Sequence, residues 1–182
     1  MRVMIDTNII ISAALFPNGR AAQAFRKALV YPFRALICDY VVEELHDKFS
    51  TKFADRKTEL EAFLYNSLRD MQVIPTPVDE ADTEYLIRDI KDRPILRAAL
   101  DAHADLFLTG DKDFLESSVT DPRIISAASF LDSFQLPLPK DTGSMSQAEI
   151  DAELEKGVRS LKEGRFYTDE EVGHLLGHKE DE

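Results

Sequence analysis

Short apolar runs alternate with longer segments of helical periodicity along most of this chain, and this alternation restricts its fold more than any other feature. The apolar runs predict five strands, at residues 2–5, 34–38, 72–74, 105–109 and 123–125. Apolar side chains at three- and four-residue spacing predict helices between them, at residues 20–31, 39–49, 57–71, 94–103 and 126–134. Strands that alternate with helices in this way form a parallel sheet with helices on its faces.

Acidic residues follow two of the predicted strands. Asp6 comes directly after the first strand, and Asp111 comes just past the fourth, in the stretch FLTGDKDFLE. Ligands of such folds bind outside the carboxyl ends of the parallel strands, so we expect both carboxylates at one edge of the sheet. Gly110 is expected to let the chain turn sharply there. Asp113 competes with Asp111 for a role, and we expect it to cap the turn into Phe114.

Two further acids are expected near the same edge: Glu44, in the helix after the second strand, and Asp92, at the start of the helix that Pro94 opens. Four carboxylates that lie close together repel one another and resist ionisation. A hard divalent cation removes this conflict, and ligands that are all oxygen suit Mg²⁺ or Mn²⁺. Such a site indicates metal-assisted hydrolysis of a phosphodiester. Taken singly, each acid is more often a turn former or a helix cap.

Composition argues against several other classes of protein. A net charge of −12 argues against a general binder of duplex DNA, because such proteins neutralise phosphates with basic side chains. The single cysteine excludes an intrachain disulfide framework and suits a reducing cytoplasm. The four histidines show no convincing zinc pattern, and no apolar stretch approaches the ~20 residues of a membrane span. We therefore expect a cytoplasmic protein without a membrane partner.

Four stretches together resemble the PIN-domain family, in the branch close to VapC-like toxins. They are MIDTNIIISA at residues 4–13, EEL at 43–45, DRPILRAALDAHADLFLTGDKDF at 92–114 and RIISAASFLDSF at 123–134. The resemblance covers roughly residues 1–135. It implies a three-layer α/β/α fold with a central parallel sheet, frequent dimerisation, and an Mg²⁺- or Mn²⁺-dependent ribonuclease that is commonly the toxin of a toxin–antitoxin module.

The resemblance also implies a role for each acid. The catalytic and metal-binding acids of the family match four positions of this chain: Asp6, Glu44, Asp92 and Asp111. Glu44 is a better match than Glu43 because it immediately precedes the leucine. The first three acids would hold a metal, and Asp111 would bind a second metal or orient the attacking water. Four neighbours are implied as supporting residues, with the first two placed to position Asp6 and the third to position Asp111: Thr7, Asn8, Thr109 and Asp113.

The sequence changes in composition after the resemblance ends. Two prolines and a Thr-Gly-Ser run indicate a linker at residues 136–145. Residues 146–182 predict two short amphipathic helices that must dock on other structure, and they resemble the toxin-binding segment of type II antitoxins. That resemblance implies an inhibitory contact in which a basic side chain reaches the acids, made by Arg165, Phe166 and Tyr167. The alternative is a helical extension that only completes the core or a dimer interface.

These observations predict a metal-dependent endoribonuclease of the toxin type. Its expected partners are RNA, a cognate antitoxin or its own C-terminal segment, and further copies of itself in a homodimer or higher oligomer. One alternative is a small α/β phosphatase, although its usual Asp-x-Asp motif is absent because Thr7 and Asn8 follow Asp6. Another alternative is a non-catalytic PIN-like module that binds RNA or protein. Loss of one of the four acids would favour that module, and none is lost.

Overall fold

The computed structural model describes residues 1–134 together with residues 151 and 155. The chain divides into two units, Met1–Gln135 and Leu136–Glu182, and every helix and strand below belongs to the first. The predicted linker at 136–145 lies outside the described residues, as does nearly all of the predicted helical tail at 146–182. The expected inhibitory residues Arg165, Phe166 and Tyr167 also lie outside them.

Five parallel strands form one sheet in the order β3-β2-β1-β4-β5. The strands are β1 (Arg2–Ile5), β2 (Arg34–Cys38), β3 (Gln72–Ile74), β4 (Leu106–Thr109) and β5 (Arg123–Ser126). Each lies where an apolar run predicted it, to within one residue at either end. The order places β1 at the centre, with β2 and β4 beside it and with β3 and β5 as the two edges.

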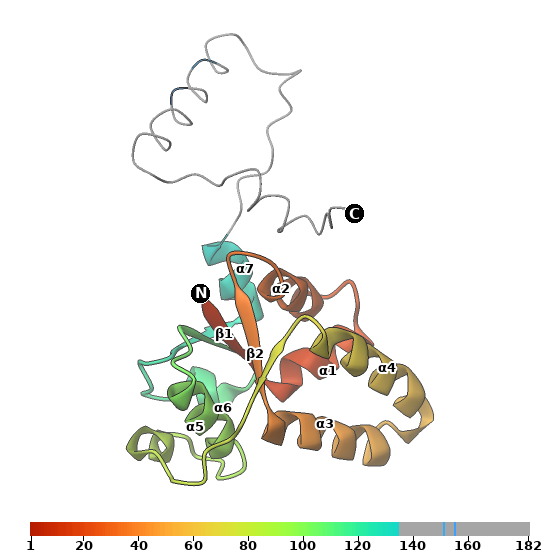
Figure 1. The fold of residues 1–182 in the computed structure, drawn as a ribbon, viewed down its shortest axis with the longest axis horizontal. Coiled ribbons are helices and arrows are strands. Elements are labelled where there is room, and N and C mark those ends of the chain that lie inside the picture. The colour runs from red at the N-terminus through yellow and green to blue at the C-terminus, as the bar shows by residue number, and fades with distance from the viewer. Residues whose placement is uncertain (135–150, 152–154, 156–182) are drawn as a thin grey trace, which may run out of the picture. The chain divides into compact units, whose positions relative to one another are not determined.

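Helices cover both faces of this sheet (Figure 1). They are α1 (Thr7–Leu15), α2 (Arg20–Ala28), α3 (Asp39–Thr51), α4 (Lys57–Leu68), α5 (Arg93–Asp101), α6 (Lys112–Leu115) and α7 (Ala127–Ser133). Two short 3₁₀ helices complete the set, η1 (Ala54–Arg56) and η2 (Asp82–Leu86). In Figure 1, α1 and α4 lie on the opposite side of the strands from α5 and α6. The predicted three-layer α/β/α fold with a central parallel sheet is therefore confirmed.

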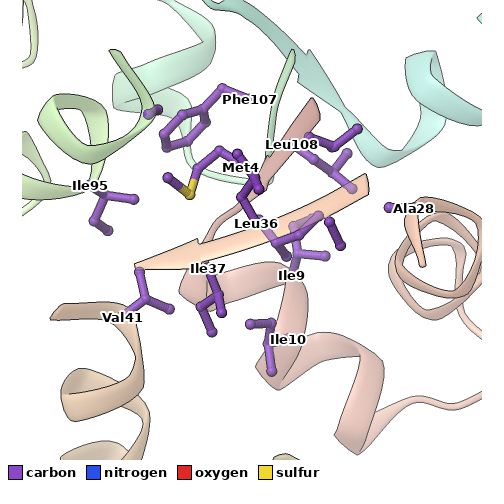
Figure 2. Packing of buried hydrophobic residues seen from close by; sticks show 14 of the residues in the cluster. Met4, Ile9, Ile10, Ala28, Leu36, Ile37, Val41, Ile95, Phe107 and Leu108 are labelled. Atoms are coloured by element: carbon purple, nitrogen blue, oxygen red, sulfur yellow. The ribbon is translucent and has the colours of Figure 1, made fainter. Parts of the chain in front are cut away.

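The core lies between the sheet and its two layers of helices. Parallel pairing sets Met4 of β1 in register with Leu36 of β2 and Phe107 of β4, and all three are fully buried. Figure 2 shows Met4 and Phe107 gathered with Ile95 of α5, whereas Ile37 lies with the residues of α1. Strands that are buried on both faces are expected to be continuously apolar. The central strands of this sheet are such apolar runs.

One helix of this fold was not predicted. Residues 7–15 form α1, although the sequence analysis assigned them to no element. The run Ile9, Ile10, Ile11 is β-branched, and such side chains have reduced helix propensity. The helix forms because packing outweighs propensity: Ile9, Ile10 and Ala13 are buried against the rest of the core. Among the residues described, no helix is both long and apolar enough to cross a membrane.

Candidate active site

Asp6 stands at the carboxyl end of the central strand. Its side chain is only 3 % exposed, and its backbone N–H donates to the Leu108 carbonyl at 3.1 Å, which anchors it to the end of β4. Thr109 Oγ1 donates to Asp6 Oδ2 at 2.6 Å. Burial raises the pKa of Asp6 to about 6; the Thr109 hydrogen bond opposes this rise, and the charges of Asp111 and Glu44 add to it.

Asp92 precedes α5, on the other side of the site. The residue caps the helix by its backbone position, and Pro94 stands in the first turn, as the sequence predicted. Burial is again the largest cause that raises its pKa, here to about 7, and the remaining causes are repulsive charges, those of Asp6, Asp111, Asp89 and Glu44. The structure therefore brings the four acids near enough for their charges to act on one another.

Glu44 lies in the second turn of α3, where both of its carboxylate oxygens are engaged. The Thr7 hydroxyl donates to Oε2. The Lys48 ammonium lies 2.9 Å from Oε1, in an ion pair one helical turn along α3. Glu43, the neighbouring acid, is exposed. The side chain that faces the other acids is thus the one that the sequence motif favoured.

Asp111 follows β4 and begins α6. Its Oδ1 accepts the backbone N–H of Asp113 at 2.8 Å, so Asp111 itself is the N-cap of this short helix. Its own N–H donates to Thr109 Oγ1 at 2.9 Å, and Asn8 Nδ2 donates to Oδ2 at 3.4 Å. The expectation that Asp113 caps the turn is wrong, because its carboxylate instead pairs with Arg88 at 2.6 Å.

The three expected positioning residues contact the acids. Thr109 bonds to Asp111 as expected and to Asp6 as well, whereas the side chains of Thr7 and Asn8 have other partners than the expected Asp6. The Thr7 hydroxyl donates to Glu44, and the Asn8 amide donates to Asp111. Of these two residues, Thr7 is the one that also affects Asp6: its backbone N–H forms a hydrogen bond that lowers the pKa of Asp6. These residues are the first two of α1, and successive side chains on a helix point about 100° apart. Thr109 reaches the first acid because β4 pairs directly with β1.

Gly110 is not required by the turn that precedes Asp111. A Cβ built at Gly110 would meet no atom of the described chain within 4 Å, and its φ is outside the left-handed region. The direction of the Asp111 carboxylate comes instead from its bonds to Thr109 and to the first turn of α6. The expected role of this glycine is therefore corrected.

Two residues of the site were not singled out from the sequence. Tyr40 lies one turn before Glu44 on α3, and its pKa is raised by burial first and then by the charges of Glu44 and Asp92. Lys48 lies one turn after Glu44 and pairs with it. The available signal was the four-residue spacing, because side chains four apart share one face of a helix.

The donor set suits Mg²⁺ or Mn²⁺ in its chemistry, since it consists of carboxylate oxygens at an edge where negative charges repel. Its present arrangement is not that of a complete ligand shell. Within the described part of the chain, no three Asp, Glu, His or Cys side chains are grouped so as to hold a metal ion. Glu44 and Asp111 each have both oxygens in hydrogen bonds or ion pairs. A cation would therefore share these carboxylate oxygens with their present partners, as hydrogen-bonded metal ligands commonly do.

A five-stranded parallel sheet in this order, with acids where the central strands end, defines an α/β domain with a polar site at its carboxyl edge. The model of the PIN domain matches residues 2–113. Because this match spans more than half of the chain, the protein belongs to the PIN-domain family, whose members are generally nucleases. The predicted family is thereby confirmed.

Solved structures show the same fold. VapBC2 from Rickettsia felis, bound to a DNA fragment from its promoter, matches with a TM-score of 0.55 and 15% identity over 69% of this chain and 98% of that chain. DNA-bound VapBC from Salmonella typhimurium matches with a TM-score of 0.54 and 17% identity over 70% of this chain and 98% of that chain. No curated protein matches.

Proposed function

We propose that this chain is a metal-dependent endoribonuclease that hydrolyses phosphodiester bonds of RNA, and that it is the toxin of a type II toxin–antitoxin module. The observation that carries the proposal is the gathering of four acids at the carboxyl edge of a PIN-family sheet. Burial is the largest cause that raises the pKa of Asp6 and of Asp92, and the charges of Glu44 and Asp111 raise both further. Perturbed carboxylates gathered in this way are typical of functional sites.

Each acid has a proposed task. Asp6, Glu44 and Asp92 would hold Mg²⁺ or Mn²⁺, and Asp111 would bind a second ion or orient the water. When bound, the cation would supply charge for the attacked phosphate and lower the pKa of a water. The chain itself keeps Asp6 in place through the Thr109 hydroxyl, and the cap of α6 holds the Asp111 carboxylate through the Asp113 N–H. Asp113 supports α6 from its ion pair with Arg88.

The proposed partners follow from the proposed activity of a toxin ribonuclease. Single-stranded RNA is the substrate, since unpaired RNA exposes its backbone and bases to a protein surface. An antitoxin, or residues 146–182 of this chain, would inhibit the enzyme, and the VapBC complexes of the same fold support an antitoxin partner. We also propose a homodimer or higher oligomer and a cytoplasmic location, where the buried thiol of Cys38 stays reduced.

Cleavage of a single-stranded RNA with Mn²⁺ tests the activity. We expect Asp6→Asn to lower kcat/KM on the order of a hundredfold or more, because the most buried acid of the site loses its charge. Asp101→Asn is the matched control, since this exposed acid lies at the far end of α5 and its loss changes the net charge equally. Equal cleavage by Asp6→Asn and the intact protein would point to a contaminant. RNA binding without any cleavage would favour the non-catalytic module.

The inhibitory role of the C-terminal segment has its own test. Arg165→Ala in the full chain removes the basic side chain that the antitoxin resemblance singles out. We expect ribonuclease activity at fixed Mg²⁺ to rise. Unchanged activity would contradict inhibition by this residue and favour a segment that only packs.

A further inference from the structure

Lys48 differs from the other described basic residues in that it pairs with one of the four acids. In the described part of the chain it is the one basic side chain in an ion pair with any of the four acids, with its Nζ 2.9 Å from Glu44 Oε1. The two side chains are 23 % and 27 % exposed, so the pair is partly shielded from water. Glu44 precedes Lys48 by four residues on α3, which is the favourable orientation for such a pair.

Both carboxylate oxygens of Glu44 have a partner. Oε1 faces the Lys48 ammonium and Oε2 accepts the hydroxyl of Thr7, so a new ligand would have to share an oxygen with one of them. Asp6 and Asp92 differ, because no basic side chain among the described residues forms an ion pair with either. The one acid that α3 contributes is thus also the one acid of the four that has an ammonium partner among the described residues.

We propose that Lys48 is a positioning residue that competes with the metal ion for Glu44, an inference that rests on the proposed function. A cation that binds Oε1 would lie close to the ammonium, and the two positive charges would repel each other at short range. Without a metal, the ammonium offsets the negative charge that Glu44 adds to the other acids. Lys48 therefore lowers the affinity of the site for the cation.

The residue just past this helix provides a control. Lys52 is the C-cap of α3, four residues after Lys48; it is exposed and forms no ion pair within residues 1–134. A change at Lys52 alters the net charge as much as a change at Lys48 does, but leaves the contact with Glu44 intact. Comparison of the two positions separates direct competition from a general effect of charge.

Calorimetric titration of the full chain with Mn²⁺ at constant pH and ionic strength tests the proposal. We expect Lys48→Met to bind Mn²⁺ about three- to fivefold more tightly, which corresponds to the upper range for a partly exposed ion pair. Lys48→Arg keeps the ion pair and should stay near the affinity of the intact protein, as should Lys52→Met. An unchanged or weaker affinity of Lys48→Met relative to Lys52→Met overturns the proposal.

A second variant, Lys48→Gln, keeps the proposal testable if Lys48→Met folds poorly. Lys48→Gln keeps a polar side chain of similar length but removes the charge, so the same gain in affinity is expected. If the intact chain neither binds Mn²⁺ nor cleaves RNA, the proposed function fails and this inference fails with it. If the intact chain does both and Asp6→Asn abolishes both, equal affinities in the Lys48 and Lys52 variants reject this inference alone.

Discussion

Thr109 joins the ends of the two central strands through a single hydroxyl group. That hydroxyl donates to Asp6 Oδ2 and accepts the backbone N–H of Asp111, at 2.6 and 2.9 Å. The residue is completely buried, so water cannot replace either bond. One side chain therefore sets the relative position of two acids that come from different strands.

Substitution of Thr109 tests this arrangement. Thr109→Val keeps the shape but leaves the buried carboxylate of Asp6 without its donor, and we expect a cost of about 1–3 kcal/mol in the free energy of unfolding at pH 8. Thr109→Ser keeps the hydroxyl and should cost only about 0.8 kcal/mol for the lost methyl. Urea denaturation of the metal-free proteins measures both. A valine variant as stable as the serine variant would contradict the hydrogen-bond account.

At the scale of elements, a buried ion pair ties the segment before Asp92 to α5. Arg97 Nε and Nη2 each lie 2.7 Å from a different oxygen of Glu84, whose side chain is 2 % exposed. Arg97 also donates to the carbonyl of Pro77 at 3.0 Å, and the Ala81 N–H donates to Glu84 at 3.2 Å. The Arg97 hydrogen bond is the main cause that lowers the pKa of Glu84, so the pair remains charged at neutral pH.

Removal of one partner should be far costlier here than on the surface. Arg97→Met leaves the Glu84 carboxylate buried without its cation, and we expect a loss of about 3–5 kcal/mol in unfolding free energy at pH 7. Arg56→Met is the comparison, because its pair with Glu59 is exposed to solvent and its loss should cost far less. Urea unfolding would measure the difference, and similar losses in the two variants would show that burial does not set the cost.

The elements also show which features a sequence reveals. The strands were predicted because continuous burial requires continuous apolar runs. Asp6 and Asp111 were placed together because parallel strands end at one edge. The short helix η2 is not among the predicted elements, because the burial of Glu84 depends on its pair with Arg97, thirteen positions away. The partners of Thr7 and Asn8 could not be predicted, since they depend on the direction in which the unpredicted α1 leaves the sheet.

At the scale of the whole molecule, the acids should make stability depend on pH and metal. The folded state raises the pKa of Asp6 from 3.8 to about 6 and that of Asp92 to about 7. A raised pKa means that the folded protein binds protons that the unfolded chain has released. The extra bound protons therefore stabilise the folded protein fully below about pH 4, and this stabilisation is lost as the pH rises through 6 and 7. For buried Asp6 the loss is about 2–3 kcal/mol.

Melting temperatures in EDTA at pH 5, 6, 7 and 8 would measure this effect. We expect a fall as the pH rises, and a partial recovery when Mg²⁺ or Mn²⁺ replaces EDTA, because a bound ion stabilises the charged acids. Asp6→Asn should flatten the fall, whereas Asp101→Asn, which removes an exposed charge, should leave its slope unchanged. A melting temperature that rises between pH 5 and 8 would contradict the assigned direction.

The two edges of the sheet limit how copies of this protein can associate. β3 has three residues and is followed at once by Pro75, while the four residues of β5 are preceded by Pro122. Proline has no N–H to offer a neighbouring strand, and short edges give few bonds. Strand addition between chains is therefore disfavoured at both edges. Short edges bounded by prolines therefore favour assembly of this domain through surfaces other than its strands, and they protect the sheet against intermolecular growth.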